Sequence, residues 1–477
     1  MHRQAEARPR GRMTRMLPMG AFTALTIGFA FELWRHIGTG GDFWTLWAAS
    51  RAVGAGLDPY RTSVLLRMAP LPPGPAPGAF LSPLFVAQFL QPLAGLPFGA
   101  ARMVWLVSNL FASGLLLYLL LLAGGFKPTT PVLLAGTALL MAFQPFDITL
   151  WLGQTDVLVV TAVAVGWCCL ARGRPVLGGL AASLAAVDVH LLLGFGFYFV
   201  YQAVGRRHYR PLAGLTAGLV ALSALCLLHP ADVARWLLVT LPHAQAAAIE
   251  PWDTLSVLQA AMELLGRHGA LAAVAVVDVG MLLLAVAAWR RPGTTLQDDL
   301  AVAAVLTLAT TTFAYNQDYL LLVLAFPFIA GQWRRVASPW WTGALAFALA
   351  VGFGLAELTG GLVAPGHAAF IVGAPLLALA LVIGVRGEHL TGAYRFWAAA
   401  WVAATLGGYA AFTWSRWEVG PELLLLSGVI TFMLLVGLHG GRSGSPPARV
   451  PGRRVRDALT ADAAVGPSAA SACHVSR

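Results

Sequence analysis

The stretch RGRPVLGGLAASLAAVDVHLLLGFGFYFVYQAVGRR, residues 172–207, decides the fold. It holds two apolar runs, 176–187 and 190–203, with arginines outside each run and Asp188 and His190 between them. Each run is shorter than the roughly 20 residues that cross a bilayer as a helix. Arginines beside membrane segments stay on the cytoplasmic side, so both flanks are expected on one side. The stretch therefore predicts a hairpin whose apex, at Asp188 and His190, is covered by protein or faces a watery cavity.

The rest of the chain is as apolar as this hairpin. Of its 477 residues, 58% are hydrophobic and 11% are charged, and the mean hydropathy is +0.73. These values lie outside the range of soluble domains, and no strand-like alternation competes with the long apolar runs. We therefore predict an all-α, polytopic membrane protein with about 12–14 membrane segments. The segments are expected near 17–34, 101–122, 131–146, 155–171, 176–187, 190–203, 211–229, 269–289, 299–314, 319–333, 340–357, 366–385, 395–413 and 421–439.

The net charge of +10 is concentrated at the two ends of the chain. Residues 1–16 and 440–477 are rich in arginine and are predicted to be cytoplasmic tails, the second one disordered. Between them, residues 17–439 form the membrane domain, and its first segment lacks a following cleavage site, so we expect it to remain as an anchor. Anionic lipid headgroups account for the basic tails, and no nucleic-acid partner is expected. The four cysteines predict neither a disulfide framework nor a metal site.

The remaining polar residues fall into three loops, which the arginine pattern assigns to the extracytoplasmic side. The largest, residues 35–100, contains APLPPGPAPGAF and a segment broken by prolines, which favours helices along the membrane surface over a spanning helix. The second loop is expected over 230–269, and the third holds YNQD at 315–318.

Five motifs, taken in order along the chain, resemble those of glycosyltransferase family 87. This family belongs to the GT-C class and contains polyprenyl-phosphomannose-dependent mannosyltransferases. The motifs are DFWTLWAASRAVGAGLDPY, FLSPLFVAQFLQPLAGLP, GQTDVLVV, RGRPVLGGLAASLAAVDVHLLL and YNQDYLLLVLAFPF. The resemblance runs from about residue 17 to about residue 335. It departs at the hairpin apex, where relatives often carry a Lys-Pro pair that could meet the donor phosphate and this chain has Asp188 and His190.

The resemblance implies that Asp42, the first carboxylate after the first segment, is the catalytic base that deprotonates the acceptor hydroxyl. A carboxylate in a partly desolvated cleft can have the proton affinity this role needs. The alternative is that Asp42 caps the helix FWTLWAASRAV. Asp58, in Asp58-Pro59-Tyr60, is interpreted as a turn residue.

Cations for the donor phosphate are sought among residues on the outer side. Arg51, Arg61, Arg267 and His190 are the candidates, since guanidinium groups bind phosphate oxygens in pairs. Headgroup contact is the alternative for Arg51 and Arg61.

The substrate-binding candidates are polar residues at the outer ends of segments. Gln154 and Asp156 open a segment, where helix N–H groups favour an anion or a sugar hydroxyl, although Asp156 could be a helix cap. Asp188, at the hairpin apex, is either functional or part of a structural pair with His190. Gln317 and Asp318 would face the same cavity or cap the next segment.

The chain has no phosphate-binding loop and no dinucleotide-binding turn, which favours a lipid-linked donor over a nucleotide sugar. The resemblance implies an inverting transfer of a hexose, with mannose as first choice, from a polyprenyl phosphate to a lipid- or glycan-linked acceptor. We expect this transfer to be metal-independent and to need no cofactor. The predicted location is the cell membrane, with both termini cytoplasmic and the active site extracytoplasmic. A transporter or flippase of a lipid-linked sugar is the alternative, although no internal repeat is evident. A non-catalytic assembly partner is a third possibility.

Overall fold

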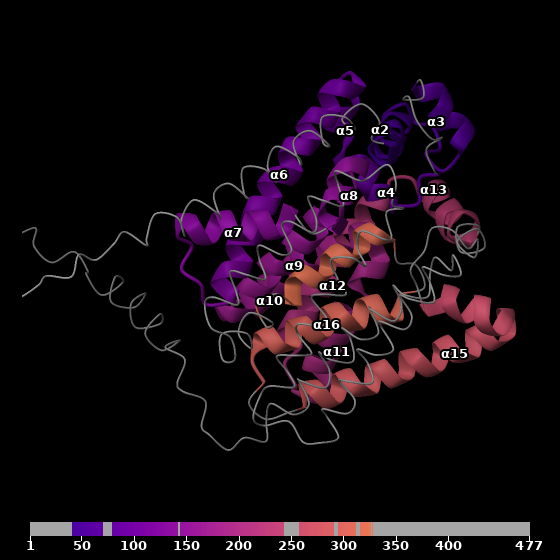
Figure 1. Ribbon diagram of the computed structural model, residues 1–477. Coiled ribbons are helices and arrows are strands. Elements are labelled where there is room, and N and C mark those ends of the chain that lie inside the picture. The colour runs from indigo at the N-terminus through magenta and orange to yellow at the C-terminus, as the bar shows by residue number, and fades with distance from the viewer. Residues whose placement is uncertain are drawn as a thin grey trace, which may run out of the picture.

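The computed structural model describes residues 41–69, 79–141, 144–242, 257–290, 294–311, 315–325 and 327. Within these ranges the regular structure is helical and no strand is present, so the predicted all-α fold is confirmed (Figure 1). The predicted first segment, the segments from 340 onward and both tails lie outside the described residues.

Four short helices form the first part of the described chain. They are α2 (Gly41–Gly54), α3 (Thr62–Met68), α4 (Leu84–Phe89) and α5 (Gln91–Ala94). Prolines shorten them: Pro83 precedes α4, Pro92 lies in the first turn of α5 and Pro97 precedes the next helix. This confirms that no long helix spans the motif FLSPLFVAQFLQPLAGLP.

α2 is more buried than a helix lying on a surface. Phe43, Trp44 and Trp47 are almost inaccessible, because α3, α4, α5 and the helix that follows α5 pack around them. α2 is therefore the core element of its own small cluster.

Longer helices follow and form a bundle. Its elements are α6 (Phe98–Ala123), α7 (Thr130–Met141), α8 (Gln144–Leu152), α9 (Asp156–Ala171), α10 (Pro175–Ala182), the 3₁₀ segment η1 (Ser183–Leu192), α11 (Leu193–Gly205), α12 (Tyr209–Cys226), α13 (Pro230–Arg235), the π-helical turn η2 (Trp236–Thr240), α15 (Val257–Trp289), α16 (Leu296–Thr310) and the 3₁₀ segment η3 (Asn316–Ala325).

Length and composition qualify four of the described helical segments to cross a membrane: Phe98–Ala123, Pro175–Gly205, Tyr209–Cys226 and Gly269–Trp289. The chain is therefore a polytopic membrane protein. One predicted segment and one predicted loop differ in detail. The predicted segment 131–146 is two helices, α7 and α8, and the predicted second loop gives way to α15 at Val257.

The segment Pro175–Gly205 has the length and composition of a spanning helix but folds back on itself. Gly166 of α9 lies against Gly178 and Ala182, while the next residue, Trp167, packs its ring 5.0 Å from that of Tyr198. In a straight helix, residues 178 and 198 would stand about 30 Å apart. The backbone leaves helical geometry at Asp188 (φ −120°, ψ 90°), so the predicted hairpin and its apex are confirmed.

The chain turns with arginines gather at one end of the bundle, which we call the basic end. They contain Lys127, Arg172, Arg174, Arg206, Arg207, Arg210 and Arg290. Hydrogen bonds between helices stabilise this end. The Trp167 indole donates to the Leu296 carbonyl (2.6 Å), and the Arg206 guanidinium donates to the Trp289 carbonyl (2.5 Å).

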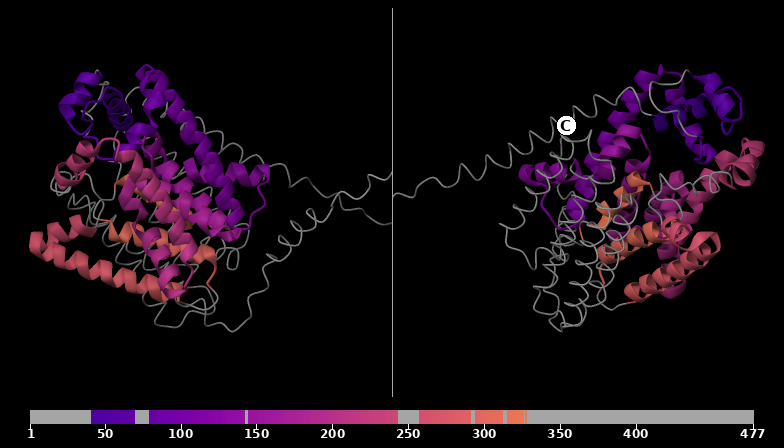
Figure 2. Two further views of the ribbon diagram at one scale, coloured as in Figure 1. Left: turned by 180° about the vertical axis from the view of Figure 1, so that it is seen from behind. Right: turned by 45° about the vertical axis from the view of Figure 1, so that its right-hand side comes forward.

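At the opposite end the helices meet α2–α5, and we call this the acidic end for its residues Asp42, Asp58, Asp156, Asp188 and Asp318. In Figure 1, α2, α3, α4 and α13 lie together in the upper part of the molecule. In both views of Figure 2, α15 lies on the side of the bundle opposite the indigo helices.

Candidate functional site

Asp42 and Gln154, which are 112 residues apart in sequence, are directly bonded at the acidic end. Asp42 is in the first turn of α2, and Gln154 is in the turn between α8 and α9. The Gln154 Nε2 donates to Asp42 Oδ2 over 2.6 Å. The hydrogen bond described for this carboxylate thus comes from the turn between α8 and α9 and not from α2 itself.

The turn that carries Gln154 is shaped by Gly153. Gly153 has a φ of +75°, which glycine adopts without strain. The N–H groups of Gly153 and Gln154 both donate to the Thr149 carbonyl (3.0 Å each), which is the usual glycine-terminated end of an α-helix. α8 therefore stops at a fixed point, and Gln154 leaves it in a fixed direction.

The first two turns of α6 hold both partners in place. The Arg102 Nη2 donates to the carbonyls of Leu150 and Trp151 at the end of α8 (2.7 Å each). One turn later, the Trp105 indole donates to the Gly153 carbonyl (2.8 Å) and stacks on Phe43, with ring centroids 5.6 Å apart. Because Phe43 is the neighbour of Asp42, α6 positions the carboxylate and the amide together.

Burial raises the pKa of the Asp42 carboxyl above the ordinary aspartate value. The hydrogen bond from Gln154 and the charge of Arg102 act in the opposite direction, since both stabilise the ionised form. A carboxylate with a raised pKa retains more proton affinity than a solvated aspartate. It can accept a proton from a hydroxyl group.

A second group of polar residues lies beside Gln154. The next residue, Thr155, donates its hydroxyl to Asp188 Oδ2 at the hairpin apex. The His190 Nε2 lies 3.1 Å from Asp318 Oδ2, and this oxygen also accepts the backbone N–H of Tyr315 (2.8 Å). The turn between α8 and α9 thus joins Asp42 to the hairpin apex and to η3.

Asp156 completes this second group. Its side chain is 2% exposed, interacts electrostatically with Asp188 and Asp318, and has one oxygen, Oδ1, without a hydrogen-bond partner. Gln317 is buried next to Asp318 in η3. Within the described part of the chain, no three His, Cys, Asp or Glu residues are arranged to hold a metal ion.

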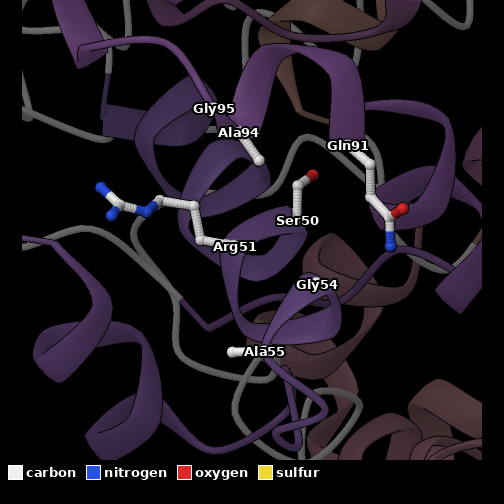
Figure 3. A pocket seen from close by; sticks show the side chains of 7 residues that line it. All are labelled: Ser50, Arg51, Gly54, Ala55, Gln91, Ala94 and Gly95. Atoms are coloured by element: carbon white, nitrogen blue, oxygen red, sulfur yellow. The ribbon is translucent and has the colours of Figure 1, made fainter.

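Two of the predicted phosphate-binding arginines lie away from this site. Arg51 follows Asp42 by nine residues, which puts it on the opposite face of α2, and its guanidinium lies 5.0 Å from the Trp47 ring centroid. It lines a shallow pocket of about 360 Å³ between α2 and α5, where Arg51 and Gln91 stand on either side of Ser50 (Figure 3). We therefore assign Arg51 to a different surface.

Arg61 also belongs elsewhere, because it pairs with Asp58 (3.2 Å). Asp58 also accepts the backbone N–H of Tyr60 (2.9 Å), as predicted for a turn residue, and pairs with Arg235 (2.7 Å). The side chain of Arg267, in α15, lies outside what the structure describes. Of the four predicted cations, His190 is the one found among the site residues.

Arg102 is the residue that sequence reasoning missed. It is 1% exposed and lies beside Asp42, with its guanidinium 5.7 Å from the Phe43 ring centroid. The rule that drew attention to Arg51 and Arg61, an arginine on the outer side of the chain, applies equally to Arg102, which lies at the start of the predicted segment 101–122.

The family comparison agrees with this architecture. The model of glycosyltransferase family 87 matches residues 80–315, about half of the chain. The chain belongs to glycosyltransferase family 87. It is therefore a membrane glycosyltransferase, which uses a sugar donor and an acceptor. The matched range includes Gln154, Asp188 and His190 and ends before Asp318, while Asp42 precedes it. Comparisons with curated proteins and with solved structures gave no match.

Proposed function

We propose that this glycosyltransferase moves a hexose, with mannose as first choice, from a polyprenyl phosphate to a lipid- or glycan-linked acceptor at the extracytoplasmic face of the cell membrane. The observation that carries the proposal is the Asp42–Gln154 pair, a partly buried carboxylate at the meeting point of α2, α6 and the turn between α8 and α9. The basic end lies opposite, and arginine-rich turns are typical of the cytoplasmic side. The acidic end then faces the side where lipid-linked sugars, rather than cytosolic nucleotide sugars, are the available donors.

The reaction is written as a single displacement. The acceptor hydroxyl gives its proton to Asp42 while its oxygen attacks the anomeric carbon of the donor. The bond from this carbon to the phosphate oxygen breaks, and the polyprenyl phosphate leaves with the electron pair. Attack opposite the leaving group inverts the anomeric centre. A phosphate is a good leaving group, so the reaction needs a base and charge stabilisation, and we propose that it needs no metal or cofactor.

His190 is the proposed cation for the departing phosphate. Its side chain is 28% exposed, so the free face of the imidazole is accessible, while the hydrogen bond to Asp318 orients the ring. The proposed ligands of the sugar hydroxyls are the remaining polar residues of the site, since carboxylates accept hydrogen bonds and amides both accept and donate them. These residues are Gln154, Asp156, Asp188 and Gln317.

The test is product formation by the purified full-length protein. Radiolabelled polyprenyl-phosphomannose is incubated with the protein and a membrane lipid extract, and we expect a labelled glycolipid or glycan and released polyprenyl phosphate. Activity should persist in excess EDTA. A flippase would instead move the intact labelled donor across a vesicle membrane and leave its sugar bond unbroken, and that outcome would overturn the proposal.

A further inference from the structure

Arg102 combines deep burial with incomplete hydrogen bonding. Its side chain is 1% exposed, and only one of its three nitrogens, Nη2, makes hydrogen bonds, both to α8 carbonyls. Nε and Nη1 have no partner among the described residues. Burying a charge this completely is costly unless something compensates for it. The two hydrogen bonds to the end of α8 therefore do not by themselves explain why a charged residue is buried at this position.

Ending α8 does not require this charge. Gly153 already provides the helix end, and Trp105 fixes the Gly153 carbonyl with a neutral indole. What the guanidinium adds is a positive charge, and the acidic group within its electrostatic range is Asp42. The two side chains form no direct ion pair under 4.0 Å in the described structure, so Arg102 acts on Asp42 through its charge and does not occupy a carboxylate oxygen.

We propose that Arg102 is a positioning residue for Asp42, which keeps this carboxylate ionised and fixes the turn that presents Gln154 to it. This inference rests on the proposed role of Asp42 as the base. Arg102 touches the α8 carbonyls and the face of Phe43, whose backbone neighbours Asp42, so a single side chain links the charge state of the base to its position. Arg102 acts through Asp42 and has no contact with substrate in this assignment.

Among the described residues, few other charged groups lie around Asp42. α4 and α5, which pack on α2, carry no charged residue, and the α3 residues Arg67 and, at its N-cap, Arg61 are exposed. In α8, Asp147 is in the first turn, at the end of the helix far from Gly153. Beyond Gln154 lie Asp156 and Asp188 with their partners. Within the described part of the chain, Arg102 is thus the cation whose removal should change the protonation of Asp42 most.

The experiment compares pH profiles of transfer from polyprenyl-phosphomannose by the full-length protein. Asp42 works in its ionised form, so activity falls as the pH drops through its pKa. In R102Q and R102M the positive charge is lost, and the acidic midpoint should move upward by about one pH unit. R102K, which keeps a positive charge, should bring the midpoint back most of the way, while its turnover stays reduced because one ammonium cannot reproduce the fork of the guanidinium.

Trp105→Phe is the matched control. It removes the hydrogen bond to Gly153 and keeps a ring to stack on Phe43, so it loosens the same turn without changing charge. We expect a lower melting temperature and an unchanged acidic midpoint. If R102Q or R102M has the midpoint of Trp105→Phe, or if neither neutral variant folds while Trp105→Phe does, Arg102 is a structural anchor and the inference is wrong. If Asp42→Asn keeps both its activity and the acidic limb, the failure belongs instead to the proposed base.

Discussion

The buried carboxylates at the two ends of the bundle have different hydrogen-bond and ion-pair partners. At the basic end, Asp299 of α16 is paired with a cation and bonded to a neutral donor: Arg206 lies 3.2 Å away, and the Tyr198 hydroxyl donates over 3.0 Å. At the acidic end no described carboxylate is paired with an arginine at this distance except Asp58: Asp42 is bonded to an amide, Asp188 to a hydroxyl and Asp318 to an imidazole. An unbonded oxygen does not distinguish the ends, since Asp156 and Asp299 each have one.

The difference separates a structural network from a reactive one. Asp299 accepts the bonds from Arg206 and Tyr198 on Oδ2 and has an arginine that compensates its charge, which suits a helix contact. Carboxylates that outnumber their cations repel one another and bind protons more readily, which suits proton transfer and the binding of hydroxyl groups. The same residue type thus predicts stability at one end and chemistry at the other.

The largest effect is expected from Asp42→Asn, which should lower transfer by about 10²–10⁴-fold, since general base catalysis typically contributes that much. Asn keeps the size of the side chain and its ability to cap a helix. The variant should therefore insert and bind the donor normally, and the loss should appear in kcat. Steady-state kinetics with labelled donor measures it.

Asp299→Asn provides the contrast from the other end. It should keep wild-type activity per folded molecule, so similar losses in the two variants would erase the distinction between the ends.

The second effect in size is expected from Gly153→Ala. The φ of +75° strains any residue with a side chain, and the new Cβ would stand 2.5 Å from Arg102 Nη1 and 2.7 Å from Phe43 Cβ. Strain and overpacking of this kind cost about 1–3 kcal/mol each. Because the displaced turn carries Gln154, we also expect transfer to drop at least tenfold, as small displacements do in active sites.

Gly173→Ala is the matched control for this variant. Gly173, between α9 and α10 at the basic end, has a φ of +72° and open space around its Cβ position. Its substitution should lower the melting temperature without a loss of transfer by the folded fraction. A drop in transfer equal to that of Gly153→Ala would mean that backbone strain alone, and not the position of Gln154, controls activity.

The hairpin and the gathering of the acidic residues could be predicted because they depend on patterns along the chain. Arginine flanks fixed the direction of the runs 176–187 and 190–203, and this brought Asp188 to the same end as Asp42. The partners of individual arginines could not be predicted, since Arg51, Arg61 and Arg102 look alike in sequence. Their different roles depend on helix rotation and on contacts such as that of Asp58 with α13, which periodicity in strongly apolar segments does not reveal.

Asp299→Asn should have a smaller effect than Asp42→Asn and Gly153→Ala, and it should change stability alone. Arg206 would lose its carboxylate partner, and Tyr198 would keep a weaker acceptor, so we expect a loss of about 1–3 kcal/mol. Because the Arg206 side chain is a third exposed, water compensates for part of the lost pairing. Thermal unfolding in detergent measures this loss, and an unchanged midpoint would show that the network adds no stability.

The smallest effect is expected from Asp58→Asn, although Asp58 lies at the same end as Asp42 and shares a loop with it. Asn retains the acceptor for the Tyr60 N–H, so the turn is preserved. What is lost is the charge that faces Arg61 and Arg235, and these side chains are 55% and 37% exposed. Exposed pairs contribute about 0–1 kcal/mol, so stability and transfer should stay near wild type in parallel melting and kinetic assays. A hundredfold loss of transfer in Asp58→Asn with normal activity in Asp42→Asn would move the base to Asp58. Both carboxylates lie at the acidic end, so what separates their expected roles is that Asp58 is paired with arginines and Asp42 is not.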